Sequence, residues 1–327
     1  MTDIDLTMRD IYSARVRIAP IARKTPLVSS PALAELTGSE ITLKLECLQE
    51  TGSFKPRGAA NKILSLDPEV RQRGVITVSS GNHGRALAYV AHRLGFRAVV
   101  CLYETVPANK RDATRKLGAE VIVKGSTYDE AAKEAYRLAE KEGLEMIHPY
   151  DDPVVIAGQG TIGLELLEEF PDLDTVVVPL SGGGLLGGIA FALKSADPGI
   201  HVVGVMMERG PAMVESLRAG RLVEIVEEPT LADALAGGII PNTYTFELLQ
   251  KTVDETVLVS EQEIAAAMAF ALEHHHLVVE GSGAVGIAAL RSGKVQHLGK
   301  HVAVVISGAN VDMPLLLRVA QDHLGSR

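Results

Sequence analysis

Short apolar runs alternate with longer amphipathic stretches along most of this chain. The runs are rich in Val and Ile and are apolar on both faces, which is typical of parallel strands covered by helices on each side. The strands predicted in this way are Val75–Ser79, Ala98–Leu102, Glu120–Val123, Thr175–Leu180, His201–Met206, Glu255–Val259 and Val302–Ile306. The clearest helical segments between them are Asn82–Leu94, Tyr128–Glu142 and Gln262–His275. The alternation predicts an α/β fold with doubly wound sheets.

A turn-rich stretch, Pro149–Pro153, divides this pattern near its middle. The part before it, from about Ser53, carries three strand–helix units, and the part after it carries the rest. A chain of 327 residues has room for two or three domains of roughly 100–200 residues each. The strands could form one sheet, but two smaller sheets fit the length better.

Composition excludes several classes of protein. Acidic and basic residues are interspersed and give a net charge of −9, so a basic nucleic-acid-binding surface is not expected. The two cysteines, Cys47 and Cys101, cannot build a disulfide framework or a CxxC motif and suit a reducing compartment. Because the sequence has no 18-residue apolar stretch and no signal-like start, we expect a cytoplasmic protein without membrane contact.

The first segment with candidate chemistry is TGSFKPRGA, residues 51–59. Ser53 could cap a helix and Pro56 suits its first turn, which would place Lys55 beside a helix N-terminus. The positive end of the helix dipole and burial both favour the neutral amine, a nucleophile toward aldehydes. An isolated lysine would more often be a surface residue, but this one is accompanied by three further segments.

The second segment, SSGNHGRA at residues 79–86, follows a predicted strand and opens a helix. Free backbone N–H groups there, with the side chains of Ser79, Ser80 and Asn82, could bind a carboxylate or a phosphate. A purely structural turn would use the same small residues, and this segment alone favours neither interpretation.

The third segment is SGGGLLGG, residues 181–188, directly after the strand Thr175–Leu180. Three consecutive glycines let the backbone approach a phosphate closely. The segment also matches the dinucleotide motif GxGxxG, but the acidic residue expected after the next strand is only loosely matched by Glu208. The fourth segment places Ser307 after the last strand, where its hydroxyl could bond a ring nitrogen of a cofactor.

These four segments in this order resemble the fold-type II pyridoxal-phosphate enzymes, specifically the threonine/serine dehydratase family. The resemblance extends from Thr25 to Asp312 and implies a tryptophan-synthase-β-like fold with the cofactor in the cleft between two domains. The larger, cofactor-binding domain would comprise residues 1–51 and 154–327. Residues 52–153 would form a smaller, inserted domain that closes over the substrate.

The resemblance also assigns roles to residues. Lys55 would hold pyridoxal phosphate in a Schiff base and, once free, remove the substrate α-proton, and Ser80 would be a second catalytic group on one face. Other residues implied to bind the cofactor are Phe54, Asn82, Ser181, Gly182, Gly183, Gly184, Leu185 and Ser307. Residues implied to bind the substrate are Ser79, Ser80, Gly81 and His83. Glu280 matches a glutamate near the cofactor, but it could equally be a first-turn acid of the helix that it opens.

The implied reaction is β-elimination of water from a hydroxy amino acid, with release of a 2-keto acid and ammonia. A serine at the ring nitrogen, in place of a carboxylate, makes the ring a modest electron sink and favours elimination over transamination. Homo-oligomers are common in the family, so a homo-oligomer is expected.

Two departures from the family pattern are visible. Met206 and Ala212 stand where many of these dehydratases have acidic ligands of a structural cation, so that site looks lost.

The adjacent His274, His275 and His276 point about 100° apart on a helix and cannot converge on one ion, so no metal site is expected.

Other stretches, at residues 106–110, 208–213, 232–239 and 242–246, resemble a hydroxyectoine-utilisation dehydratase subgroup. This subgroup would act on an ectoine-derived diamino acid, and Gly237-Gly238 could open space for it or simply form a loop. The alternatives are an amino-acid racemase of the same fold, with Ser80 as second base, a non-catalytic amino-acid-binding module and a nicotinamide-dependent oxidoreductase. The oxidoreductase rests on GxGxxG alone.

Overall fold

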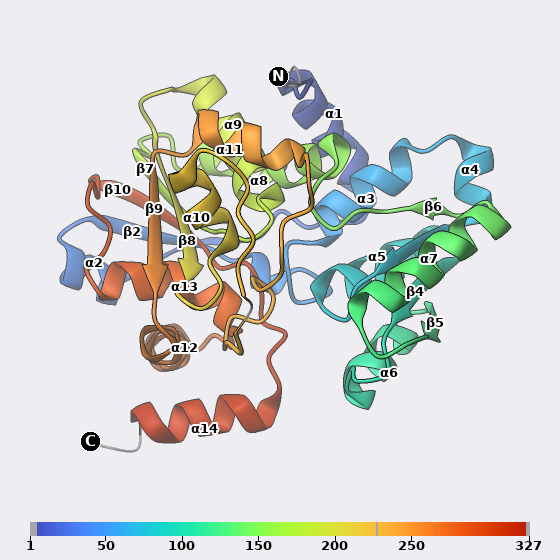
Figure 1. The fold of residues 1–327 in the computed structure, drawn as a ribbon. Helices are drawn as coiled ribbons and strands as arrows, with labels where there is room; N and C mark the ends of the chain where they lie inside the picture. The colour runs from blue at the N-terminus through green and yellow to red at the C-terminus, as the bar shows by residue number, and fades with distance from the viewer. Residues whose placement is uncertain (1–4, 227, 325–327) are drawn as a thin grey trace.

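The computed structural model describes residues 5–226 and 228–324, which form two β-sheets with helices on both faces (Figure 1). In spatial order, the strands of the larger sheet are β1 (Leu27–Ser29), β2 (Glu40–Lys44), β10 (His301–Val305), β7 (Thr175–Pro179), β8 (His201–Met207) and β9 (Glu255–Val259). Those of the smaller sheet are β5 (Glu120–Val123), β4 (Ala98–Leu102), β3 (Val75–Val78) and β6 (Glu145–Met146). The prediction of two smaller sheets is confirmed.

The helices of the larger sheet form two layers (Figure 1). One layer contains α1 (Met8–Ile18), α8 (Pro153–Glu169), α9 (Gly184–Ala196) and α11 (Tyr244–Thr252). The other contains α2 (Pro31–Thr37), α12 (Glu261–His275), α13 (Gly281–Arg291) and α14 (Met313–Leu324). The 3-10 helix η1 (Glu46–Leu48) follows β2, and α10 (Ala212–Ala219) follows β8.

The smaller sheet is covered in the same way. Helices α3 (Pro56–Ser65), α5 (Asn82–Leu94) and α6 (Ala108–Lys116) lie on one side, and α7 (Tyr128–Glu142) packs on the other. The short α4 (Pro68–Arg73) lies near β6. Each sheet has its own apolar core, centred on residues such as Val178 and Val304 in the larger and Leu87 and Val100 in the smaller. All four strands of the smaller sheet fall within residues 52–153, while the exact domain boundaries stay a prediction.

Most strand predictions agree with the structure to within one residue. Ala98–Leu102, Glu120–Val123 and Glu255–Val259 agree at both ends. The expectation of two apolar faces was wrong for β5, which is an edge strand and keeps Glu120 exposed. The strands β1, β2 and β6 were not predicted. β1 is antiparallel to β2 in an otherwise parallel arrangement of the described strands.

The strand order creates a switch point between β10 and β7. The two strands are parallel neighbours, but the chain leaves β7 toward β8 and β9, whereas β10 pairs with β2 on its other side. Their carboxyl ends lead directly into Ser181 and Ser307. In open α/β sheets, ligands bind outside the carboxyl ends of strands at such a point.

Candidate functional site

Lys55 occupies the N-cap position of α3, immediately before Pro56. Its ammonium nitrogen Nζ donates a hydrogen bond to the carbonyl oxygen of Pro149 at 2.7 Å. Burial lowers the pKa of Lys55 to about 8, so near neutral pH more of this amine is neutral and nucleophilic than of an ordinary lysine. The predicted cap was wrong, because Ser53 Oγ is buried without a hydrogen-bond partner and does not cap the helix.

The turn that carries Lys55 is attached to the loop after β10. The backbone N–H of Phe54 donates to the carbonyl of Ser307 at 3.1 Å, and Ser53 forms an isolated antiparallel bridge with Gly308. The Lys55 nitrogen lies 5.1 Å from the centre of the Phe54 ring. The structure therefore brings Phe54, Lys55 and the buried Ser307 together.

The glycine-rich turn lies at the neighbouring strand end. Gly183 adopts a left-handed conformation, with φ +92°, and caps α9, which begins at Gly184. The N–H groups of a first helical turn have no acceptor within the helix, so they and the positive helix end favour an anion. The Ser181 hydroxyl donates to the carbonyl of Leu235 at 3.0 Å, which fixes the start of the turn.

Close packing leaves no room for side chains on this turn. A Cβ at Gly182 would lie 2.6 Å from the Tyr150 ring, and one at Gly184 would lie 2.7 Å from the Tyr150 carbonyl oxygen. A Cβ at Gly183 would lie 2.7 Å from Leu249. Residues 182–184 must therefore be glycines for the backbone to be held against Tyr150 and α11, and an anion there would meet backbone rather than side chains.

The loop from β3 to α5 contains the predicted substrate residues. Ser79, Ser80 and Gly81 are partly exposed, and α5 begins at Asn82 without a side-chain cap on its N–H groups. His83 differs from its neighbours, because its ring is buried and its Nε2 faces the Ile147 carbonyl at 3.1 Å. Burial, and then the nearby Lys55 charge, lower the pKa of His83 to about 3, so its ring is neutral. An anion in this loop would therefore be bound by N–H groups and hydroxyls.

A buried network connects this loop with the larger sheet. Asn82 Nδ2 donates to Glu280 Oε1 at 2.7 Å, and the backbone N–H of Asn310 donates to Glu280 Oε2 at 2.9 Å. Asn310 Nδ2 also donates to Asn82 Oδ1 at 2.6 Å. Burial raises the pKa of Glu280 to about 7, against these hydrogen bonds. Glu280 is therefore bonded to Asn82, a residue implied to bind the cofactor, while its side chain does not cap α13. A place for Glu280 near the cofactor stays a prediction.

Sequence reasoning missed four residues of this region. Pro149 accepts the Lys55 hydrogen bond, Tyr150 packs on the glycine turn, and His148 makes an edge-on ring contact with Tyr150 at 4.6 Å between centroids. Thr245 donates from Oγ1 to the Gly182 carbonyl at 2.6 Å. The only signal for Pro149 and Tyr150 was the turn-rich stretch at 149–153, which by itself indicates no more than a domain boundary, and His148 lies just before that stretch.

The two positions where the family has acidic cation ligands are buried and apolar in this chain. Met206 and Ala212 are almost fully buried, and within residues 5–226 and 228–324 no group of three or more His, Cys, Asp or Glu side chains is placed to hold a metal ion. Gly238 faces open space, since a Cβ there would meet nothing within 4 Å, and Gly237 has φ +133°. No helix in the described part of the chain is both long and apolar enough to span a membrane.

Comparison with known proteins settles the family. Residues 18–308 match the family model described as pyridoxal-phosphate dependent enzyme. The chain belongs to this family. It is 48% identical to an L-threonine ammonia-lyase of Thermotoga maritima over 98% of this chain and 79% of that protein.

Two solved structures are similar over most of their length. One is the processed form of threonine deaminase isoform 2 from Solanum lycopersicum, with a TM-score of 0.89 and 35% identity over 96% of this chain and 88% of the other. The other is maize serine racemase, with a TM-score of 0.91 and 34% identity over 98% of both chains. The chain is therefore a pyridoxal-phosphate-dependent enzyme with the fold-type II architecture.

The site geometry fits this cofactor. A partly neutral lysine amine, a glycine turn that opens α9, and a buried serine hydroxyl lie at the ends of strands and the starts of helices. These groups match an aldehyde, a phosphate and a ring nitrogen in chemistry. The GxGxxG match lies in this same glycine turn. Glu208, the acidic residue that a nicotinamide site would need, is exposed and paired with Lys294 at 3.2 Å, so it does not support that alternative.

Proposed function

We propose that this enzyme eliminates water from L-threonine or L-serine and releases the corresponding 2-keto acid and ammonia. The observation that carries the proposal is the half-buried Lys55 amine, which bonds to the Pro149 carbonyl next to the Tyr150 ring on the glycine turn and acts on His83 through its charge. It lies in a chain closely similar to a threonine ammonia-lyase and a threonine deaminase. When bound, pyridoxal phosphate would withdraw electrons from the substrate α-carbon.

Most of the predicted site residues have a place in this proposal. Lys55 holds the cofactor and, once displaced, takes the α-proton, for which a pKa near 8 is well suited. The N–H groups of Ser181–Leu185 hold the phosphate, Ser307 bonds the ring nitrogen, and Asn82 orients the ring with Glu280 behind it. The Ser79–Gly81 loop binds the substrate carboxylate, and buried His83 supports that loop through the Ile147 carbonyl.

A racemase is the second candidate, because a serine racemase has the same fold at a TM-score of 0.91. Racemisation needs a proton donor on the face of the substrate opposite Lys55. Ser80, partly exposed in the substrate loop, is our candidate for this donor.

Three finer features belong to the same proposal. An ectoine-derived diamino acid is a further candidate substrate, and the open space at Gly238 supports it. The enzyme acts in the cytoplasm, in keeping with two free, buried cysteines, and it forms a homo-oligomer.

The test compares keto-acid and ammonia release from L-threonine, L-serine and the ectoine-derived compound, together with chiral analysis of the remaining serine. Lys55→Ala should abolish both the visible absorption of the bound cofactor and turnover. Lys62→Ala is the matched control, because Lys62 lies about two turns further along the same helix and pairs with Asp152 at 2.7 Å. Undiminished turnover by Lys55→Ala without added amine would contradict the proposal. Faster formation of D-serine than of pyruvate would make the enzyme a racemase.

A further inference from the structure

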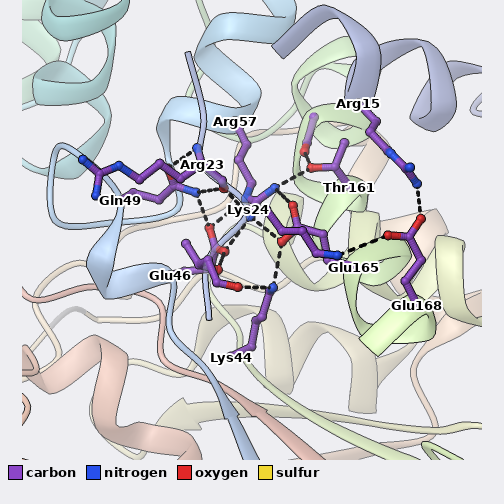
Figure 2. Close-up of polar contacts among 12 residues, drawn as sticks. Arg15, Arg23, Lys24, Lys44, Glu46, Gln49, Arg57, Thr161, Glu165 and Glu168 are labelled. Atoms are coloured by element: carbon purple, nitrogen blue, oxygen red, sulfur yellow. Dashed lines mark hydrogen bonds and ion pairs between the residues drawn. The ribbon is translucent and has the colours of Figure 1, made fainter. Parts of the chain in front are cut away.

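Two basic and two acidic side chains lie buried together around Arg57, which follows Lys55 by two residues on the chain (Figure 2). This buried ion cluster comprises Lys44, Glu46, Arg57 and Glu165. Lys44 and Glu46 are fully buried, Arg57 is 1% exposed and Glu165 is 8% exposed. Its two positive and two negative charges balance. Lys44 also pairs with Glu169 at 3.6 Å at the edge of the cluster, and Glu169 in turn pairs with the exposed Lys24 at 3.2 Å, so this further carboxylate has its own counter-charge.

Arg57 is the centre of the cluster. Its Nε and Nη2 donate to the two carboxylate oxygens of Glu46, both at 2.8 Å. Its Nη1 and Nη2 donate to the two oxygens of Glu165, at 2.6 and 2.8 Å. Bonds to Thr161 Oγ1 and to the Arg23 carbonyl, both at 3.1 Å, complete the set. A planar guanidinium held by two two-pronged contacts has one allowed orientation.

The cluster joins the start of α3 to three parts of the larger sheet unit. Glu46 lies in η1 directly after β2, Glu165 lies on α8, and Lys44 at the end of β2 reaches Glu165 at 2.7 Å and the Thr25 carbonyl at 2.6 Å. Although burial opposes it, the Arg57 guanidinium lowers the pKa of Glu46 below its ordinary value, so this carboxylate stays ionised.

Glycines bring α3 and α8 unusually close at the same level. A Cβ at Gly158 would lie 2.6 Å from the Arg57 carbonyl oxygen, and a Cβ at Gly58 would lie 2.3 Å from the Gln159 side chain. The backbone of the first α3 turn is thus held by direct helix contact as well as by the Arg57 side chain. On the other side of Lys55, the bond from Phe54 N–H to Ser307 fixes the preceding residue.

We propose that the buried ion cluster is a positioning device for Lys55: Arg57 fixes the first turn of α3, and the balanced charges keep a net field away from the lysine. The proposal rests on the proposed function for its kinetic consequence. Buried ion pairs are seldom the most stable way to fill a core, because the free energy needed to remove two charges from water often exceeds the free energy gained from their attraction. Fixed geometry for a reacting group is a benefit that apolar side chains could not supply.

The test uses the holoenzyme with Arg57→Lys, which keeps the charge but loses the paired contacts, and Glu165→Gln, which keeps the shape but removes one negative charge. The control is Leu164→Ala. Leu164 is the residue next to Glu165 on α8, but it packs in a separate apolar cluster with Ile11 and Leu248, so the control loses stability without touching the ion cluster.

For Arg57→Lys we expect kcat to fall by about 10- to 100-fold with KM changed less than about twofold, since misplacing a reacting group affects mainly the chemical step. For Glu165→Gln, one uncompensated positive charge should move the pH titration of the cofactor's visible absorption band down by roughly half a pH unit. Leu164→Ala should lower the melting temperature and leave kcat and the titration unchanged.

The proposal is overturned if Arg57→Lys and Glu165→Gln behave like Leu164→Ala, with lower melting temperatures but wild-type kcat and titration. If either variant does not fold, Thr161→Val replaces it. It removes one bond to Arg57, together with the bond from Thr161 Oγ1 to the Gly158 carbonyl on the same helix, and should reduce kcat about threefold. A wild-type enzyme inactive on threonine and serine would refute the proposed function only. The titration of the cofactor band in the same variants would still test the positioning of Lys55.

Discussion

Glu280 should make the stability of the protein depend on pH in a direction opposite to that of most carboxylates. Its side chain is 4% exposed, and burial raises its pKa from 4.5 to about 7 in the folded chain. Unfolding returns the pKa to its ordinary value, so the folded chain binds this proton more tightly. The stabilisation is complete below pH 4.5 and is lost as the pH rises through 7. The difference of about 2.5 pKa units corresponds to about 3 kcal/mol.

Urea unfolding of the cofactor-free protein, in steps from about pH 4.5 to about pH 8, measures this effect against Glu280→Gln, which cannot titrate. The unfolding free energy of the wild type relative to the variant should fall by about 3 kcal/mol across the range. Glu263→Gln is the control. Burial would raise the pKa of Glu263, but the bond to Lys294 outweighs it and lowers that pKa, so the stability that Glu263 contributes is lost as the pH falls. Parallel curves for the wild type and Glu280→Gln would refute the reasoning.

Three further predictions concern single residues. Gly182→Ala should weaken cofactor binding at least about tenfold by equilibrium titration, because the new Cβ would collide with the Tyr150 ring, whereas Gly238→Ala, facing open space, should bind normally. Ser80→Ala should suppress formation of D-serine more strongly than release of ammonia, as chiral chromatography would show, since elimination needs no proton donor on that face. Cys101 is fully buried with a pKa raised by burial to about 12, so a thiol reagent should label it only as fast as the native protein opens, which mass spectrometry can follow.

The pattern of apolar residues was sufficient to predict the regular part of the fold. Buried strands such as Ala98–Leu102 and the helix Asn82–Leu94 have a strong periodicity, and the structure has them with the same bounds. The strands β1 and β6 have only three and two residues, too few for a period to show. Their pairing depends on neighbours distant in sequence, and no local pattern records that.

The candidate site was predictable where backbone conformation limits the choice of residue. The glycines at 182–184 and the lysine before Pro56 are such cases. Contacts between distant segments were not predictable: Glu280 and Asn82 are separated by 198 positions, and Arg57 and Glu165 by 108. The residues around Glu280 and Glu165 do not distinguish them from surface glutamates, because their burial depends on which helices pack together. The predicted Ser53 cap failed for a related reason, since the segment pairs with Gly308 from the far end of the chain.

The position of β10 has a consequence for how the protein is made. This strand is the last in the described chain, yet it lies in the middle of the larger sheet, hydrogen-bonded to β2 on one side and β7 on the other. During synthesis on the ribosome, the smaller sheet can close early, because residues 75–146 are contiguous and leave the exit tunnel long before the end. The larger sheet cannot be completed until β10 has been synthesised, and until then the edges of β2 and β7 that pair with β10 are exposed. The enzyme therefore acquires its cofactor pocket as one of the final events of its own production, and a chain that ends before residue 301 is exposed to aggregation as well as inactive.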